Sequence, residues 1–360
     1  MPPPARRDAL RALLAQAGEV DALLVTDLVN VRYLTGFTGS NACLLVGVDG
    51  TDTLCTDGRY TLQVAAEVPD LPAVIDRAGP VALLRDLPAR GIGRLGFESD
   101  AVTVEAHSAL AEAAAPATLH RVPGLVQRLR AIKDADEVAA LREACAVADA
   151  ALADLLAAGG LRPGRTERDV ALDLEVRMRG RGATAPAFES IIAAGPNSAV
   201  PHHRPSTVQL RRGDLVTLDF GALVDGYHSD MTRTVVLGPA ASWQRELYDL
   251  VAAAQRAGCA ALVPGAEVTA VDAAARDVVA AAGERVNFPH GLGHGVGLRI
   301  HEAPGLGPTG TGHIAAGMAV TVEPGVYLAG RGGVRIEDTL LVRDGGPEPL
   351  SRTTRGLLEL

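Results

Sequence analysis

Residues 215–237 read LVTLDFGALVDGYHSDMTRTVVL, and this stretch predicts a β-hairpin that carries two acids. The Asp-Gly pair at 225–226 is a strong signal for a two-residue turn. A turn there pairs Asp219 with Thr232 and makes Asp219 and Asp230 diagonal neighbours on one face. Such neighbours lie about 7–8 Å apart, and the ions of a two-metal site lie about 3.5–4 Å apart. The hairpin therefore presents two carboxylates that can flank a pair of metal ions.

A second hairpin repeats this arrangement nearer the C-terminus. Residues 318–328 read MAVTVEPGVYL and residues 333–342 read GVRIEDTLLV, so Glu323 and Glu337 each stand in an apolar strand. Four carboxylates gathered in a partly dry sheet repel one another, and burying them without partners is strongly unfavourable. They must therefore be protonated, solvated or bound to cations, and two divalent ions would cancel the four charges.

The fifth ligand is sought at 288–304, which reads FPHGLGHGVGLRIHEAP. Glycines let the backbone pass close to a site, and His294 is flanked by them. Four oxygen ligands and one nitrogen suit Mn²⁺, Co²⁺, Zn²⁺ or Fe²⁺ better than a thiolate-preferring metal. A single inward acid is more often a hydrogen-bonded structural residue, but five such residues together favour a metal site. These five are Asp219, Asp230, His294, Glu323 and Glu337.

The rest of the second half predicts helices between these strands. Apolar residues recur at three- and four-residue steps after residue 136, which indicates a long helix. Thr166 and Thr269 each precede an acid by three residues and resemble N-caps, while Gly258 weakens the helix expected around it. We expect helices at 136–158, 167–179, 243–262 and 270–282. This half is therefore α+β, with helices on one face of a largely antiparallel, curved sheet.

The first part of the chain alternates short apolar runs with helical stretches and predicts an α/β layer with a mixed sheet. A charged stretch at 122–137 with a Pro-Gly pair near its start marks a junction, so we expect domains at 1–127 and 128–360. The expected strands are 22–26, 42–48, 51–57, 72–76 and 93–98, and the expected helices are 8–17, 62–67, 81–87 and 103–114.

Composition excludes several classes of protein. The net charge of −9 is spread along the 360 residues and argues against a nucleic-acid or anionic-membrane partner. No apolar run reaches the roughly 18 residues of a spanning helix, and charges interrupt the only apolar run near the N-terminus, so no signal-peptide core can be drawn. The four cysteines lack Cys-x-x-Cys spacing and are expected to be reduced core residues. We therefore expect a cytoplasmic protein.

Several motifs resemble those of the pita-bread metallopeptidases, and within them the Xaa-Pro branch of aminopeptidase P and prolidase. The motifs are LDFGALVDGYHSDMTRT at 218–234, HGLGHGVGLRIHEAP at 290–304, TVEPGVY at 321–327 and GGVRIEDT at 332–339. NVRYLTGFTGSNACLLV at 30–46 and TDGRYTLQ at 56–63 are similar to the creatinase-like N-terminal domain of that branch. The resemblance spans the chain and implies an α+β pita-bread catalytic domain preceded by a smaller α/β creatinase-like domain.

The resemblance implies a role for each matching ligand. Asp219 would bind one ion through both oxygens, and Asp230 and Glu337 would bridge the two ions. His294 and Glu323 would complete the second ion. A metal-activated hydroxide would be the nucleophile, and Glu323 would carry its proton towards the leaving amine. Of the divalent metals we expect manganese first, with cobalt, zinc or iron as alternatives.

Three further residues match or adjoin the family pattern. His202, in AVPHHRPS at 199–206, matches a histidine that contacts substrate near the scissile bond, and its neighbour His203 is less favoured. His301 matches the histidine that stabilises the developing oxyanion or holds the proline side. Arg335 lies two residues before Glu337 on the same strand face, so it is expected to orient a carboxylate or to contact substrate.

The activity that the resemblance implies is removal of the N-terminal residue from short peptides with proline in second place, by a homodimer. Gly305 stands where some prolidases place a substrate-gripping arginine, which favours an Xaa-Pro aminopeptidase over the alternative, an Xaa-Pro dipeptidase. Two further alternatives are a non-catalytic peptide-binding protein and a creatinase-type hydrolase on the same fold. The five retained ligands count against both.

Overall fold

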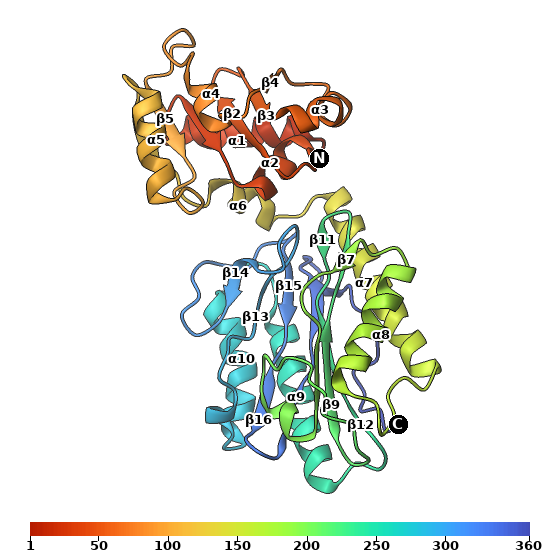
Figure 1. The fold of residues 1–360 in the computed structure, drawn as a ribbon. Coiled ribbons are helices and arrows are strands. Elements are labelled where there is room, and N and C mark those ends of the chain that lie inside the picture. The colour runs from red at the N-terminus through yellow and green to blue at the C-terminus, as the bar shows by residue number, and fades with distance from the viewer. The chain divides into compact units, whose positions relative to one another are not determined.

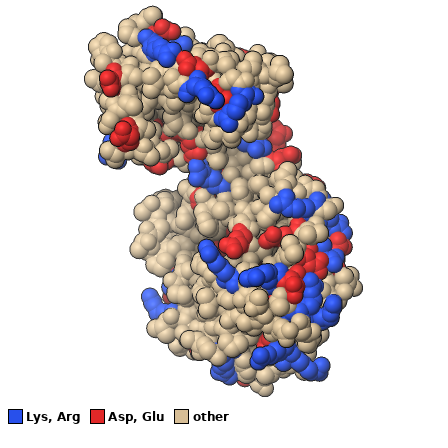
Figure 2. Space-filling model, in the orientation of Figure 1, with Lys and Arg blue, Asp and Glu red and all other residues tan.

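The structure, a computed structural model, describes all 360 residues and divides into two compact units, Met1–Arg130 and Ala131–Leu360 (Figure 1). The boundary predicted between residues 127 and 128 lies inside helix α6 (Leu125–Ala131). Acidic and basic side chains are mixed over the visible face of each unit, without a large area of one sign (Figure 2). None of the helices combines the length and the apolar character needed to cross a bilayer.

The first unit is built on a six-stranded sheet of order β4-β3-β2-β1-β5-β6. Strand β1 pairs antiparallel with β2 and parallel with β5, so the mixed sheet expected from the sequence is confirmed. Its strands are β1 (Ala22–Val25), β2 (Ala42–Gly47), β3 (Thr53–Thr56), β4 (Ala73–Ile75), β5 (Arg94–Phe97) and β6 (Thr118–Arg121). Its helices are α1 (Pro3–Ala17), α2 (Leu28–Thr35), η1 (Gly58–Tyr60), α3 (Thr61–Glu67), α4 (Pro80–Leu84), α5 (Val104–Ala114) and α6.

Besides the short 3-10 helix η1, three elements of this unit were not predicted. Strand β6 lies at the edge of the sheet and is only partly buried, so it lacks the apolar run that identified the other strands. Helix α2 is eight residues long and carries two valines, which favour strands. The sequence nevertheless contains an N-cap for α2, because the Asp27 side chain accepts a hydrogen bond from the backbone N–H of Val29. The third is α6, which occupies the stretch expected to be a linker.

Four long helices belong to the second unit: α7 (Ala135–Ala157), α8 (Glu167–Gly180), α9 (Ser242–Ala261) and α10 (Val268–Ala281). The predicted capping box of α8 is present, since Thr166 and Asp169 exchange hydrogen bonds with each other's backbone N–H. The cap predicted at Thr269 is wrong, because α10 begins earlier, after Glu267. A competing backbone hydrogen bond from Val271 to the Glu267 carbonyl draws Thr269 into the first turn.

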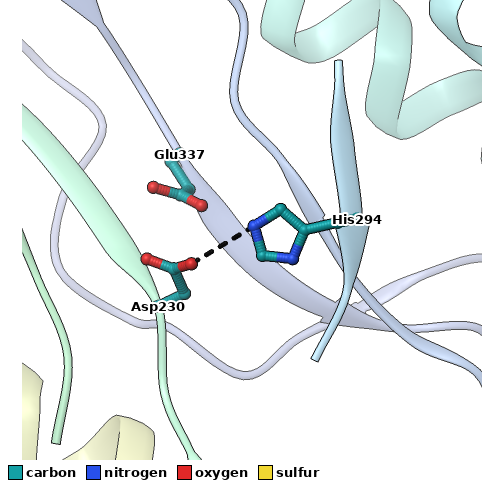
Figure 3. Close-up of side chains that lie close together, drawn as sticks. All are labelled: Asp230, His294 and Glu337. Atoms are coloured by element: carbon teal, nitrogen blue, oxygen red, sulfur yellow. Dashed lines mark ion pairs between the residues drawn. The ribbon is translucent and has the colours of Figure 1, made fainter. Parts of the chain in front are cut away.

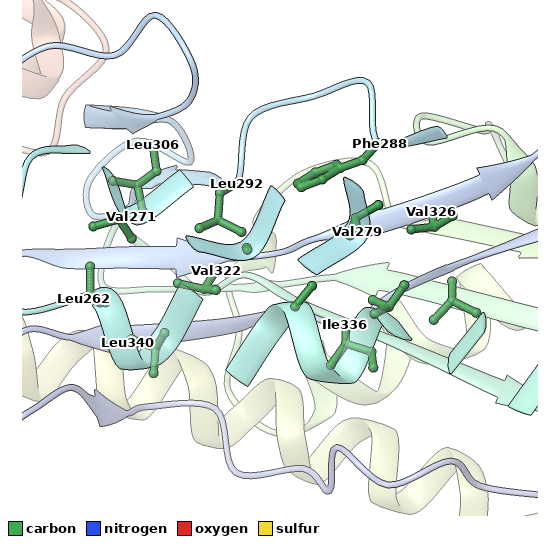
Figure 4. Close-up of a cluster of buried hydrophobic side chains, with 14 of the residues drawn as sticks. Leu262, Val271, Val279, Phe288, Leu292, Leu306, Val322, Val326, Ile336 and Leu340 are labelled. Atoms are coloured by element: carbon green, nitrogen blue, oxygen red, sulfur yellow. The ribbon is translucent and has the colours of Figure 1, made fainter. Parts of the chain in front are cut away.

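The glycine that weakened the prediction of α9 is explained by packing. A Cβ atom at Gly258 would lie 3.0 Å from the side chains of Leu292 and Val322, so any larger residue there would have to displace these two neighbours. Around this contact a large apolar core joins α9 and α10 to the strands, with Val271 from the helix side and Ile336 from the strand side (Figure 4). A second core joins α7 and α8 to β8, β9 and β12.

The recorded strand pairs of the second unit are all antiparallel, which agrees with the expected sheet. They form ladders of order β12-β9-β8, β14-β13-β15-β18-β19, β11-β10-β7 and β16-β17. The strands are β7 (Ala185–Pro186), β8 (Ile191–Ala194), β9 (Leu215–Phe220), β10 (Ala222–Val224), β11 (Tyr227–His228), β12 (Met231–Val236), β13 (Gly293–Gly295), β14 (Glu302–Leu306), β15 (Ala319–Val322), β16 (Gly325–Leu328), β17 (Gly332–Arg335), β18 (Asp338–Leu341) and β19 (Glu348–Pro349). Two short 3-10 helices, η2 (Gly195–Ala199) and η3 (Arg285–Asn287), join them.

The first hairpin has the predicted register. Asp219 lies opposite Thr232, and beyond the irregular part of the ladder Leu223 lies opposite His228 in the same register. The turn residue Asp225 has φ 47°, as a two-residue turn of the primed type requires. At Gly221 a Cβ atom would lie 1.8 Å from the carbonyl oxygen of Ser229, so only glycine allows the strands this close an approach.

The second hairpin also forms as expected. Val322 lies opposite Asp338 in the β15–β18 ladder, and Gly325 lies opposite Arg335 in the β16–β17 ladder. The two ladders share one register, so Glu323 and Glu337 stand opposite each other in the gap between them. In that gap the backbone N–H groups turn to other parts of the fold: Glu323 donates to the Leu292 carbonyl, and Glu337 donates to the Thr232 carbonyl.

Candidate metal centre

Residues from three separate strand segments meet at one point in the second unit (Figure 3). Ligand atoms of Asp230, His294 and Glu337 lie within 4.8 Å of one another. The His294 Nε2 atom is 3.5 Å from Asp230 Oδ2 and 3.4 Å from Glu323 Oε1. Asp230 directly precedes β12, His294 is in β13, and the two glutamates lie between the ladders of the second hairpin. Four of the five predicted ligands therefore lie together: Asp230, His294, Glu323 and Glu337.

The fifth predicted ligand, Asp219, lies in β9 and is 8% exposed. Its Oδ2 accepts a hydrogen bond of 2.6 Å from Arg335 Nη2, whereas its buried Oδ1 has no partner. Glu337 is similar: Oε2 accepts from the Thr232 hydroxyl at 2.7 Å, and its buried Oε1 has no partner. Nearly all buried polar atoms in proteins have a hydrogen-bond partner. Two unpartnered carboxylate oxygens at one site therefore indicate a cation-binding site, and the oxygen-rich ligand set fits divalent metals.

The electrostatics of the cluster point the same way. Burial raises the pKa of Asp230 to about 6 and the pKa of Glu323 to about 7, and it raises the pKa of Glu337 well above its usual value. Burial acts to lower the pKa of His294, but the hydrogen bond and charge of Asp230 outweigh it and raise that pKa to about 9. The site thus holds protons that divalent cations would replace.

A hydrogen-bond network supports one side of the cluster. Arg335 is 3% exposed, and besides Asp219 it donates from Nη1 to the Tyr327 hydroxyl at 2.8 Å. His290 Nε2 lies 2.9 Å from the same hydroxyl. Burial lowers the pKa of His290 to about 4, so its imidazole is neutral at physiological pH. The network holds the Arg335 guanidinium in place against Asp219.

A cavity of about 470 Å³ opens over these residues. His301 lines it, with its ring centroid 4.4 Å from that of His294 and the two rings almost perpendicular. Burial lowers the pKa of His301. Tyr227 is not part of the lining, and its hydroxyl donates to Glu137. The lining contains each nominated site residue, namely Asp219, Asp230, His294, Glu323, Glu337, His202, His301 and Arg335.

Comparison with known proteins places this geometry in a family. Residues 139–344 match the model of metallopeptidase family M24, and residues 6–132 match the creatinase/prolidase N-terminal domain. The chain belongs to metallopeptidase family M24. An Xaa-Pro dipeptidase of Pyrococcus furiosus is 35% identical over 342 residues, which are 94% of this chain and 95% of that protein.

Solved structures of M24 relatives agree with this assignment. An Xaa-Pro dipeptidase from Bacillus anthracis has a TM-score of 0.95 at 38% identity, covering 99% of this chain and 100% of that one. An X-Pro aminopeptidase from Thermotoga maritima has a TM-score of 0.88 at 30% identity, covering 95% and 98%. The predicted resemblance and the predicted fold class, a pita-bread domain with a creatinase-like N-terminal domain, are confirmed. The chain is a metallopeptidase of the Xaa-Pro branch.

Some residues of this M24 site were not singled out from the sequence. Thr232 supports Glu337, and the Thr321 hydroxyl donates to Glu323 Oε1 at 3.2 Å and accepts from the His294 backbone N–H at 3.0 Å. The sequence contained a signal for each threonine. Thr232 is the cross-strand partner of Asp219, and Thr321 precedes Glu323 by two residues on the same strand face. Tyr327 stands within a quoted motif, but its contact with Arg335 becomes visible only in three dimensions.

Proposed function

We propose that this M24 metallopeptidase is an exopeptidase that hydrolyses the Xaa-Pro bond of dipeptides. The observation that carries the proposal is the cavity, where the five candidate ligands, two further histidines and the two orphaned carboxylate oxygens meet. Relatives whose names state Xaa-Pro dipeptidase activity align with nearly the whole chain, which supports the same chemistry here.

The candidate ligands would hold two divalent ions, with manganese expected first and cobalt, zinc or iron as alternatives. Bound at this site, such ions would lower the pKa of water and polarise the scissile carbonyl. Arg335 would hold the Asp219 carboxylate correctly turned, because it donates to one oxygen and leaves the other to a cation. Thr232 would fix Glu337 in the same way.

Three side chains would act on the substrate. Glu323 is more open than Asp230, with 18% of its side chain exposed against 7%, so its carboxylate can pass a proton to the leaving amine. His301 lines the cavity beside His294 and would donate a hydrogen bond to the carbonyl oxygen as negative charge develops there. His202 also lines the cavity and would contact the substrate near the scissile bond.

One arginine of the cavity lining supports a preference for dipeptides. Its lining includes two arginines, and Arg335 is committed to Asp219 and Tyr327. The other, Arg204, has 86% of its side chain exposed and only a long contact of 3.7 Å with Glu189. An exposed arginine at the rim of the cavity can pair with the terminal carboxylate that a dipeptide places next to its proline.

Xaa-Pro aminopeptidase activity, the function preferred from the sequence, is the second candidate. Gly305 lies in β14, where it offers no side chain to grip a terminal carboxylate, and a structural relative is an X-Pro aminopeptidase. The names of the relatives support the dipeptidase alternative better than this prediction. A homodimer and a cytoplasmic location are part of the proposal, and light scattering and cell fractionation test them.

A peptide-length series tests the proposal. Protein treated with a chelator is reloaded with Mn²⁺, Co²⁺ or Zn²⁺ and given Ala-Pro, Ala-Pro-amide, Ala-Pro-Ala and, as a control, Ala-Ala. We expect a large metal-dependent gain and fastest cleavage of Ala-Pro. Faster cleavage of Ala-Pro-Ala would establish the aminopeptidase instead, and no hydrolysis with any metal would reject both activities.

The same series tests the role of the rim arginine. Arg204→Met should raise KM for Ala-Pro about tenfold and leave KM for Ala-Pro-amide unchanged, because only the first substrate carries the carboxylate. Glu189→Gln is the matched control, since it removes the neighbouring charge and keeps Arg204. An equal rise in KM for both substrates would rule out carboxylate binding by this residue.

A further inference from the structure

A buried carboxylate outside the metal cluster organises one wall of the cavity. Glu167 is the first residue of α8 and is fully buried. Its Oε1 accepts hydrogen bonds from the Ala194 backbone N–H at 2.8 Å and from Asn197 Nδ2 at 2.9 Å. Its Oε2 accepts from His203 Nε2 at 2.8 Å and from the Ser206 backbone N–H and hydroxyl at 3.0 and 2.6 Å. One side chain therefore binds both ends of the segment 194–206.

This segment depends on such contacts, because most of it has no strand or helix partners. After η2, residues 200–206 form only turns and irregular backbone. The fold could satisfy buried polar groups of such a segment only through side chains or water. Burial alone would raise the pKa of Glu167, but the hydrogen bonds from Ser206, Asn197 and Ala194 outweigh burial and lower it. The acceptor is therefore an ionised carboxylate, whose hydrogen bonds are stronger than those of a neutral group.

The contact with His203 bears on the adjacent histidine. Both rings belong to the cavity lining, but His203 is tied to Glu167, whereas His202 is exposed to the cavity. His202 lines the same cavity as His290 and His301. Arg335 Nη1 also reaches the Pro201 carbonyl, at 3.3 Å, and fixes the residue just before His202.

We propose that Glu167 is a positioning residue that holds His202 at the substrate, with His203 and Ser206 as the links between them. The proposal rests on the proposed function, since it assigns Glu167 to the same site. It also explains the adjacent pair: His203 is a structural link, and His202 alone contacts substrate. Displacing a positioned group by about 1 Å can lower a rate by about a hundredfold, so loss of this carboxylate should be visible in turnover.

The test is a double-mutant cycle on Ala-Pro hydrolysis by the metal-loaded, full-length protein. Glu167→Gln keeps the shape of the side chain but replaces one acceptor oxygen by a donor, which opposes His203 and Ser206. We expect kcat to fall about 10- to 100-fold with the metal content unchanged. In a His202→Ala background the same change should slow the reaction by less than about twofold, because the group it positions is gone. Glu175→Gln, on the same helix, is the control and should stay within about twofold of wild type.

Several results would overturn the proposal. An unchanged kcat in Glu167→Gln would do so, and so would an equal loss with and without His202, which would show that Glu167 acts elsewhere. If Glu167→Gln does not fold, Ser206→Ala takes its place in the cycle, with a smaller expected loss of about threefold and the same dependence on His202. Inactive wild-type protein would instead reject the proposed function; a crystal structure of the variant with His202 in its original position would then reject the positioning role.

Discussion

The strongest quantitative prediction concerns stability of the metal-free protein. Burial raises the pKa of Glu323 from 4.5 to about 7, so the folded state holds this proton more tightly than the unfolded chain. The stability that the proton provides is complete below pH 4.5 and is lost as the pH rises through 7. The full difference corresponds to about 3 kcal/mol, most of which falls between pH 5 and pH 8.

The assay is thermal unfolding in a chelator at pH 5 and pH 8, with wild type and Glu323→Gln side by side. For a unit of this size about 1 kcal/mol changes Tm by roughly 2–4 °C, so wild type should lose about 5–10 °C more than the variant over this pH range. Groups that do not interact with Glu323 contribute equally to both proteins, so the comparison isolates Glu323 together with the Asp230 and His294 charges that are coupled to it. The raised pKa of Asp230, about 6, also makes the stability of the metal-free protein fall as the pH rises.

Metal ions should reverse the trend. They bind the deprotonated cluster of the folded protein, so the gain in Tm on adding Mn²⁺ should be larger at pH 8 than at pH 5. A metal-free wild type whose Tm is flat or rises from pH 5 to pH 8 relative to Glu323→Gln would refute the reasoning. So would a gain from Mn²⁺ that does not depend on pH.

Three further predictions follow from the site and its support. Changing Asp230 and Glu337 together to alanine should remove bound metal, measured by elemental mass spectrometry, and lower Ala-Pro hydrolysis at least about 1,000-fold; a metal-free variant with normal turnover would contradict the site. Arg335→Met should weaken metal binding about 10- to 100-fold in a competition titration, because Asp219 loses the guanidinium that orients it. An unchanged metal affinity would show that Arg335 does not support the metal site. Gly258→Ala should cost about 1–3 kcal/mol in denaturant unfolding, whereas Gly180→Ala, which meets open space, should not; equal effects would contradict the packing argument.

The parts of the fold that sequence could predict are those set by short-range rules. The Asp-Gly turn and the alternation of apolar residues determine the register of the first hairpin, and Asp219 opposite Thr232 follows from counting outward from the turn. The same alternation set Glu323 and Glu337 on facing strands. The α10 start was misplaced because a threonine followed by an acid can stand either before a helix or within its first turn, and only the chain entering the helix decides.

The support of the site could not be predicted in this way. Glu167 and His203 are 36 residues apart, and Arg335 and Asp219 are 116 residues apart, so no local pattern links them. Each pair forms because packing brings distant segments together. The sequence offers both His202 and His203 as substrate-contacting histidines. The difference between them arises from Glu167 of α8, which binds His203.

The distribution of the candidate ligands along the chain has a consequence for how this protein is made. Asp219 and Glu337 are both buried at the centre, yet much of the polypeptide lies between them. During synthesis the ribosome must release the last of these strands before the metal cluster can close. An emerging chain therefore cannot complete the cluster until Glu337 has left the ribosome, more than a hundred residues after Asp219.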